Sequence, residues 1–298
     1  MRRARTGPPA ATTNRHRGAV LALITPFGLF FSLFYLLPIG YAIYKSTLVI
    51  EREGTFGPPT EVFGGLAQYA AVFENAPFWE SVVRMLAFGI VQVPVMLGLA
   101  LVFALLLDSP LIRGKRFFRL AYFVPYAVPG VIAAIMWGFL YSPNLSPFTS
   151  VTQTIPFLSG QLVLASIANV VTWVFVGYNM LIIYSALLAV PGELHEAAKL
   201  DGAGQVRIAW AIKVPLVRPA IILTAVFSII GTLQLLAEPQ VFRTFSAAVN
   251  STYTPNLAIY TTASVPNTNL AAAMSVILAL GTFILSFGFL KLTQRGDR

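Results

Sequence analysis

Six stretches of this chain carry no Asp, Glu, Lys or Arg over roughly the length that a membrane-crossing helix needs. A helix rises about 1.5 Å per residue, so a hydrocarbon core of about 30 Å takes roughly 20 apolar residues to cross. The stretches cover residues 18–44, 85–107, 120–141, 161–190, 219–237 and 269–290. Because lipid offers no hydrogen bonds to the backbone, each crossing is expected to be helical. The sequence therefore predicts an all-α membrane protein with six transmembrane helices.

The composition agrees with this prediction and excludes several other classes. Charged residues make up 10% of the chain and the mean hydropathy is +0.76, whereas soluble domains carry roughly 25% charged residues. There is no cysteine, and His16 and His195 are the only histidines, which argues against thiol, disulfide and zinc chemistry. The net charge of +9 does not indicate nucleic-acid binding, because the basic residues lie at the termini and between the apolar stretches.

The placement of the basic residues predicts the orientation. Most of the 20 lie in the amino tail, between the second and third stretches, between the fourth and fifth, and in the carboxyl tail. Basic residues favour the cytoplasmic side, so both termini are expected there. The chain then divides into a basic cytoplasmic tail over residues 1–17 and a six-span domain over 18–298. A cleaved secretory signal is the alternative for the first stretch, but its length and the lack of a small-x-small site favour an uncleaved span.

The connection over residues 191–219 is more than a polar loop. Residues 193–200 have high helix propensity, and Leu194, Ala197 and Ala198 fall on one helical face. Gly202 then permits a turn, and a second amphipathic piece is expected to run to Pro215. Two short helices around a glycine would form a knob for a partner protein. A helix lying on the lipid headgroups is the alternative on physical grounds alone.

A longer pattern in this connection resembles the EAA motif of permease subunits of bacterial ATP-binding-cassette (ABC) importers. The family pattern is Glu-Ala-Ala, three residues, Gly, nine residues and Ile-x-Leu-Pro. Glu196-Ala197-Ala198, Gly202 and Ile212-Lys213-Val214-Pro215 match it at the same spacing, with Val214 in place of the commoner leucine. Asp201-Gly202-Ala203 resembles the version found in carbohydrate importers, and the pattern is closest to the first of two paired sugar permeases.

The resemblance implies a type I ABC importer permease in a bacterial cell membrane. The implied partners are a second permease, two ATPase subunits that use ATP and Mg, and an extracellular or periplasmic solute-binding protein. No cofactor is expected on this chain, and it has no Gly-x-x-x-x-Gly-Lys-Ser/Thr loop of its own. The connection would be the coupling helix that docks on an ATPase: Glu196 would make the polar contact, Ala197 and Ala198 the close packing, and Gly202 the turn. The residues assigned to this coupling are Glu196, Ala197, Ala198, Asp201, Gly202, Ala203 and Pro215.

Polar or aromatic residues inside the spans are candidates for the solute pathway, because such residues tend to face a pathway or a neighbouring helix. The candidates are Gln92, Asn169, Trp173, Asn179, Gln234 and Glu238. The expected solute is a sugar or oligosaccharide. The alternatives are a permease for another solute, such as glycerol phosphate, a polyamine or an anion, and an autonomous secondary transporter. A membrane enzyme is disfavoured because the spans hold almost no titratable groups.

Overall fold

The computed structural model describes residues 13–52, 54, 57–264 and 267–295. The first half contains α1 (Thr13–Phe31), a π-helical turn (Ser32–Leu36), α2 (Leu37–Lys45), an antiparallel hairpin of β1 (Leu48–Arg52) and β2 (Pro59–Phe63), α3 (Ala67–Glu74), α4 (Ala76–Asp108), α5 (Lys115–Ala127) and α6 (Gly130–Tyr141). The second half contains α7 (Thr149–Thr154), α8 (Val163–Leu188), α9 (Gly192–Leu200), α10 (Gln205–Ile208), a second π-helical turn (Ala209–Lys213), α11 (Val214–Leu233), α12 (Ala237–Phe242), α13 (Pro255–Ser264) and α14 (Thr268–Arg295). Of the tail expected over residues 1–17, residues 1–12 lie outside the described part and 13–17 belong to α1.

The prediction of six spans agrees with the helices observed. Among the described residues, five helices are long and apolar enough to cross a membrane, and α5 with α6 provides the sixth when the pair is counted as one span. This third span is bent by 97°, whereas the sequence predicted one unbroken stretch. Val128 is extended at the break, with ψ of 125°, and Pro129 caps α6. A proline clashes with a helical conformation of the residue before it, which explains the break.

Both π-helical turns lie just before a proline. The turn Ser32–Leu36 precedes Pro38, and the turn Ala209–Lys213 precedes Pro215. A proline inside a helix lacks an N–H group and its ring clashes with the carbonyl four residues earlier. A wider turn relieves that clash without ending the helix. The chain therefore remains helical past each proline.

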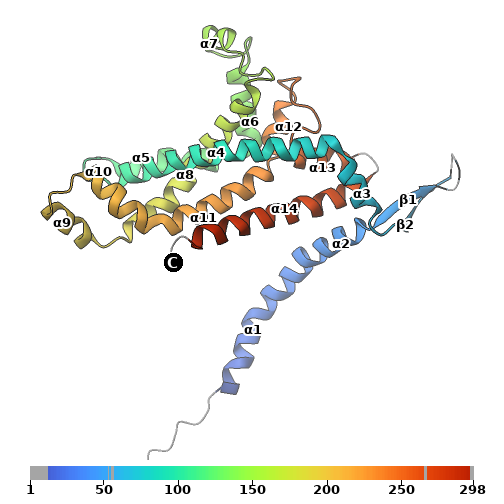
Figure 1. Ribbon diagram of the computed structural model, residues 1–298, viewed down its shortest axis with the longest axis horizontal. Coiled ribbons are helices and arrows are strands. Elements are labelled where there is room, and N and C mark those ends of the chain that lie inside the picture. Colours follow the sequence, from blue (N-terminus) through green and yellow to red (C-terminus); the bar gives the residue numbers. More distant parts are fainter. Residues whose placement is uncertain (1–12, 53, 55–56, 265–266, 296–298) are drawn as a thin grey trace, which may run out of the picture.

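The core of the membrane bundle is the contact between α4 and α8. Ala100 and Ala104 of α4 are fully buried and face Met180 and Ile183 of α8 in one apolar cluster. Small residues let two backbones approach closely, which is the usual basis of helix packing in membranes. Figure 1 shows α4, α11 and α14 running along one another, with α9 at one end of the bundle and the β1–β2 hairpin beyond the other.

Two parts extend away from this bundle. The span Val20–Lys45 contains no buried residue, and Figure 1 shows α1 pointing away from the other helices. The segment of α6 and α7 rises from the bundle on another side (Figure 1). The hairpin was not predicted, because its strands lie in a connection rich in charges and turn residues.

Candidate coupling loop and membrane cavity

The helix α9 ends in the turn that the sequence predicts at Gly202. Gly202 has φ of +78°, in the left-handed region. The N–H of Gly202 donates to the carbonyl of Lys199 at 3.0 Å, and the N–H of Ala203 donates to the carbonyl of Ala198 at 2.9 Å. These two bonds form a Schellman motif, which satisfies carbonyls that the end of a helix would leave without partners. The knob therefore has a defined shape.

The exposed side of the knob contains most of the residues assigned to coupling. Glu196, Ala197, Asp201 and Gly202 are exposed, and Ala203 is partly exposed. Ala198 is only 8% exposed, so it packs within this chain and does not present its methyl group outward. Of the two alanines, only Ala197 exposes its side chain, and the contact of both with a partner stays a prediction. Leu200, at 89% exposed, is an apolar side chain on the knob that the motif did not single out.

The second half of the loop differs from the expectation at Pro215. The amphipathic piece was expected to end there, but α10, the second π-helical turn and α11 follow one another without a gap from Gln205 to Leu233. Pro215 is exposed and lies inside this continuous helix, directly after the π-helical turn that accommodates it. A helix that begins in the knob therefore continues into the membrane span.

Four of the six pathway candidates line one cavity of about 420 Å³ between α4, α8 and α11: Gln92, Asn179, Gln234 and Glu238. Gln92 and Asn179 are buried, and the Nε2 group of Gln92 donates to Thr172 Oγ1 at 3.3 Å. The Oε1 atom of Gln92 is buried without a hydrogen-bond partner among the described residues. A buried polar atom normally has a partner, so this oxygen has an unmet capacity to accept a hydrogen bond on a residue that lines the cavity.

Aromatic side chains form another part of the cavity wall. Phe175, Tyr178 and Phe227 line it, and the Tyr178 ring stacks on Tyr126 with centroids 4.6 Å apart. The sequence did not indicate these three residues, because an aromatic residue within an apolar span gives no sign of which way it faces. The described lining contains no Lys, Arg or His.

The structure places the other two candidates elsewhere. Asn169 Nδ2 donates to the hydroxyl of Tyr141 at 2.7 Å. The Trp173 ring meets the edge of Trp137 at 5.9 Å between centroids, within the apolar cluster between α6 and α8. Neither residue lines this cavity, and the contacts of both fit the alternative considered for intramembrane polar groups, that of holding neighbouring helices together. Their assignment to the pathway stays a prediction.

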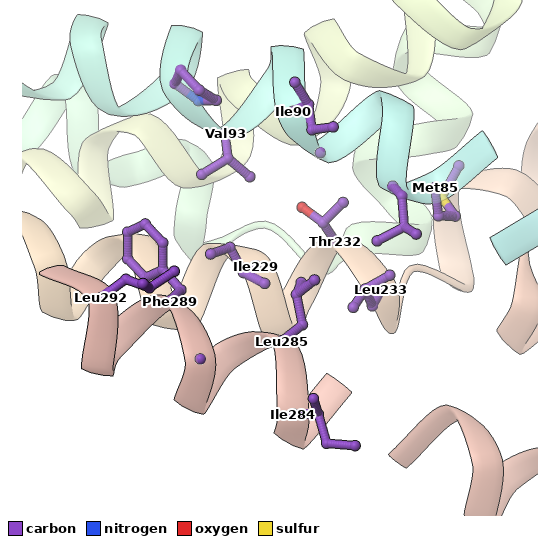
Figure 2. A pocket seen from close by; sticks show the side chains of 14 residues that line it. Met85, Ile90, Val93, Ile229, Thr232, Leu233, Ile284, Leu285, Phe289 and Leu292 are labelled. Atoms are coloured by element: carbon purple, nitrogen blue, oxygen red, sulfur yellow. The ribbon is translucent and has the colours of Figure 1, made fainter. Parts of the chain in front are cut away.

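A larger cavity of about 610 Å³ lies between α4, α11 and α14. Figure 2 shows Ile90 and Val93 from α4, Ile229 and Thr232 from α11, and Leu285 from α14 around it. Its lining is almost entirely carbon, and it contains none of the pathway candidates. A polar solute would find no hydrogen-bond partners there beyond Thr232, so the smaller cavity is the candidate solute site.

Membrane helices around a cavity that contains a few polar groups, with a helical knob at one end, fit a permease subunit of a transport system. Residues 78–295 match the family described as "Binding-protein-dependent transport system inner membrane component". The chain belongs to this family and is a multi-pass component of the inner membrane. The matched region contains the cavity and the whole knob.

Several characterised relatives are similar over most of the chain. The lactose transport system permease protein of Rhizobium radiobacter is 31% identical over 76% of this chain and 79% of its own length. The diacetylchitobiose uptake system permease protein of Streptomyces coelicolor is 29% identical over 90% of this chain and 80% of its own. The sn-glycerol-3-phosphate transport system permease protein of Agrobacterium fabrum is 31% identical over 66% of this chain and 67% of its own.

The fold is also similar to that of solved ABC transporters. A chain of a bacterial transporter that imports the acidic polysaccharide alginate superposes with a TM-score of 0.74, covering 94% of this chain and 96% of the other at 16% identity. A chain of the MetNI methionine transporter superposes with a TM-score of 0.54 over 74% of this chain and 94% of the other, also at 16% identity. At such identities the likeness shows the fold and leaves the solute to be argued from the cavity.

Proposed function

We propose that this chain is the transmembrane permease subunit of an ABC importer that moves a neutral sugar or oligosaccharide from a solute-binding protein into the cytoplasm. It works with a second permease, two ATPase subunits and the solute-binding protein. ATP and Mg are used by the ATPase subunits, since this chain has no phosphate-binding loop. The family membership and the relatives named for lactose and diacetylchitobiose support this assignment.

The observation that carries the choice of solute is the cavity that contains Gln92. Its lining combines amide and hydroxyl groups with the aromatic rings of Tyr178 and Phe227. A site that binds a small molecule is usually apolar with a few placed polar groups. Amides can exchange hydrogen bonds with sugar hydroxyls, and an aromatic ring can cover an apolar sugar face.

The same lining disfavours glycerol phosphate and other anions, which some relatives are named for. Phosphate recognition usually relies on Arg, Lys or the N-terminus of a helix. The described lining offers no cationic side chain and includes the buried carboxyl group of Glu238. The carboxyl group of Glu238 supplies no positive charge for a phosphate, whereas it can exchange hydrogen bonds with hydroxyl groups.

The first experiment tags the carboxyl end, extracts the protein gently from its own membranes and identifies the proteins that copurify. We expect an ATPase subunit and a second six-span permease in stoichiometric amounts. Recovery of the folded chain alone would instead favour an autonomous transporter.

The second experiment measures uptake by the reconstituted complex in the presence of competing neutral disaccharides or sn-glycerol-3-phosphate. Competition by the phosphate ester alone would refute the proposed solute.

The cavity itself is tested with a near-isosteric substitution. Gln92→Leu removes the free amide oxygen while keeping the volume of the side chain. Because about one hydrogen bond to the solute is lost, we expect uptake to fall about fivefold to tenfold. Gln294→Leu, at an exposed position in the last turn of α14, is the matched control and should leave uptake unchanged. Equal uptake by the two variants would show that the solute does not contact Gln92.

A further inference from the structure

Asp108 is an acidic residue at a position of its helix where a negative charge is unfavourable. It is the last residue of α4, where the helix dipole carries partial negative charge and disfavours a carboxylate. A serine and a proline follow it, so the helix could end there with any side chain at position 108. A carboxylate at such an unfavourable position indicates that Asp108 has a stabilising partner elsewhere in the fold.

That partner is Lys213, which lies 105 residues further along the chain. The Nζ group of Lys213 forms an ion pair with Oδ2 of Asp108, and both side chains are 16% exposed. Lys115, at the start of α5, donates from Nζ to the backbone carbonyl of Asp108 at 3.2 Å. The pair is thus largely withdrawn from solvent, and little-exposed charges are screened much less than surface ones.

Lys213 belongs to the second π-helical turn, between α10 and α11. This turn is the point where the helix that leaves the knob enters the membrane span. The ion pair therefore joins the root of the coupling loop to the end of α4. Turns of this type often occur at functional sites, because a widened turn can shift without breaking the helix.

The helix α9 also lies next to the Asp108–Lys213 ion pair, through its residue His195. The charges of Lys213, Lys199, Asp108 and Glu196 all act on the His195 ring. Its Nδ1 atom is buried and has no hydrogen-bond partner within the part of the chain that the structure describes. The knob, the π-helical turn and α4 thus meet around Asp108.

The helix α4 continues from this junction to the other end of the bundle. It passes the candidate solute cavity at Gln92. Near its other end, Arg84 donates from Nη1 to the carbonyl of Tyr253 at 2.9 Å, and its guanidinium lies 4.7 Å from the centre of the Tyr253 ring. A single helix therefore extends from the coupling loop, along the cavity, to the segment before α13.

We propose that the Asp108–Lys213 ion pair is the positioning link through which a displacement of the coupling loop moves α4 and thereby the wall of the solute cavity. This inference rests on the proposed function. Neither residue contacts ATP or solute in this scheme; each acts by holding two helices together. A loop docked on an ATPase but detached from α4 would let the ATPase cycle without reshaping the cavity.

The test is a charge exchange in the complete reconstituted complex. Asp108→Lys, Lys213→Asp and the double variant are compared for the number of ATP molecules hydrolysed per solute imported. Each single variant places two like charges together, and we expect this ratio to rise about tenfold, the change that follows from losing one charge-assisted hydrogen bond. The double variant restores an attractive pair and should return the ratio to within about twofold of the native value. Glu61→Gln, which breaks the ion pair between Lys45 of α2 and Glu61 of β2, is the matched control and should not change the ratio.

Two results would overturn the link: native coupling in both single variants, or a double variant that is as uncoupled as either single one. Asp108→Asn serves if a charge reversal prevents assembly, and copurification of the ATPase verifies that the complex forms. The thermal midpoint of unfolding, measured for the native complex and the same variants, reports whether the ion pair stabilises the protein and does not depend on transport. If the native complex shows no ATP-driven uptake, the proposed function fails. In that case the thermal midpoints still show whether the ion pair forms. A double variant that is no more stable than the single variants would refute the ion pair.

Discussion

Single residues of the knob act mainly through the backbone, and Gly202 is the clearest case. A Cβ atom at Gly202 would meet no atom within 4 Å, so crowding does not select glycine there. The positive φ of +78° does, because a residue with a side chain loses about 1–2 kcal/mol in the left-handed region. The turn that presents Glu196 and Ala197 therefore depends on backbone freedom at one position.

We predict that Gly202→Ala reduces ATP-coupled uptake without changing membrane insertion. The substitution disfavours the Schellman turn, so part of the population presents a misshapen knob to the ATPase. Gly204→Ala is the matched control, because Gly204 has φ of −71° and equally open surroundings. Uptake and copurified ATPase are measured for both variants. If the two lost uptake equally, steric contact with the partner and not the turn would be the cause.

The surroundings of His195 predict that the stability of the knob depends on pH. Burial, followed by the ammonium groups of Lys213 and Lys199, lowers the pKa of His195 below its ordinary 6.5, while Asp108 and Glu196 act in the opposite sense. The folded knob therefore holds the neutral ring more strongly than the unfolded chain does. As pH falls below 6.5, the unfolded chain takes up the proton first, so the folded knob loses stabilisation.

We expect hydrogen exchange at the amides of α9 to show this loss. Between pH 7.5 and pH 5.5, protection should decrease after correction for the intrinsic pH dependence of exchange. In His195→Gln the corrected protection should stay constant, because the titrating group is gone. A native protein whose corrected protection does not change over this range would contradict the assignment to His195.

The packing of whole helices depends on close backbone contact where α5 meets α8. A Cβ atom on Gly177 of α8 would lie 1.7 Å from the carbonyl oxygen of Tyr122 in α5. No atom of a flexible side chain can move aside to relieve that overlap, because the obstacle is backbone. The two helices approach this closely only because position 177 has no side chain. The aromatic residues Phe175 and Tyr178 flank it and line the cavity.

Gly177→Ala should accordingly destabilise the protein by about 3 kcal/mol, the upper end of the usual cost of overpacking. The measurement is the thermal midpoint of the purified protein, together with the fraction that remains monodisperse. Gly98→Ala, in α4 with nothing within 4 Å of the added atom, tests the effect of an alanine in a span. A midpoint for Gly177→Ala equal to that of Gly98→Ala would mean that α5 and α8 pack less closely than described.

At the scale of the whole molecule, the predicted orientation in the membrane would place the knob on the cytoplasmic side. The chain has no cysteine, so a single introduced cysteine reports one position without interference. Val206 in α10 is 73% exposed and Val151 in α7 is 46% exposed. If both termini are cytoplasmic, as the basic residues predict, these two positions lie on opposite sides of the membrane.

We predict that a membrane-impermeant maleimide added to intact cells labels the Val151→Cys variant and not the Val206→Cys variant. Permeabilised cells should show labelling of both, which controls for the accessibility of position 206. Labelling of Val206→Cys in intact cells would contradict the predicted topology, because it would place the knob on the outer side of the membrane, where no ATPase could dock.

Local and one-dimensional features could be predicted from the sequence. A span is an uninterrupted apolar stretch, so the six stretches indicated the membrane helices before any contact was known. The residues from 193 to 215 predicted a helix, a turn at Gly202 and a second amphipathic helix, because propensity and the permissive backbone of glycine act over a few residues. The bend at Pro129 was missed, although the proline that causes it is visible in the sequence.

The direction in which each side chain faces was decided only by the tertiary structure. Gln92 and Asn169 are both polar residues in apolar spans, yet one borders the cavity and the other binds Tyr141. Ala197 and Ala198 are neighbours in one motif, yet one is exposed and the other buried. Asp108 and Lys213 meet across 105 residues. Such contacts depend on how helices rotate and pack against one another. The apolar pattern of a span specifies that a helix crosses the membrane and leaves its rotation to the packing of its neighbours.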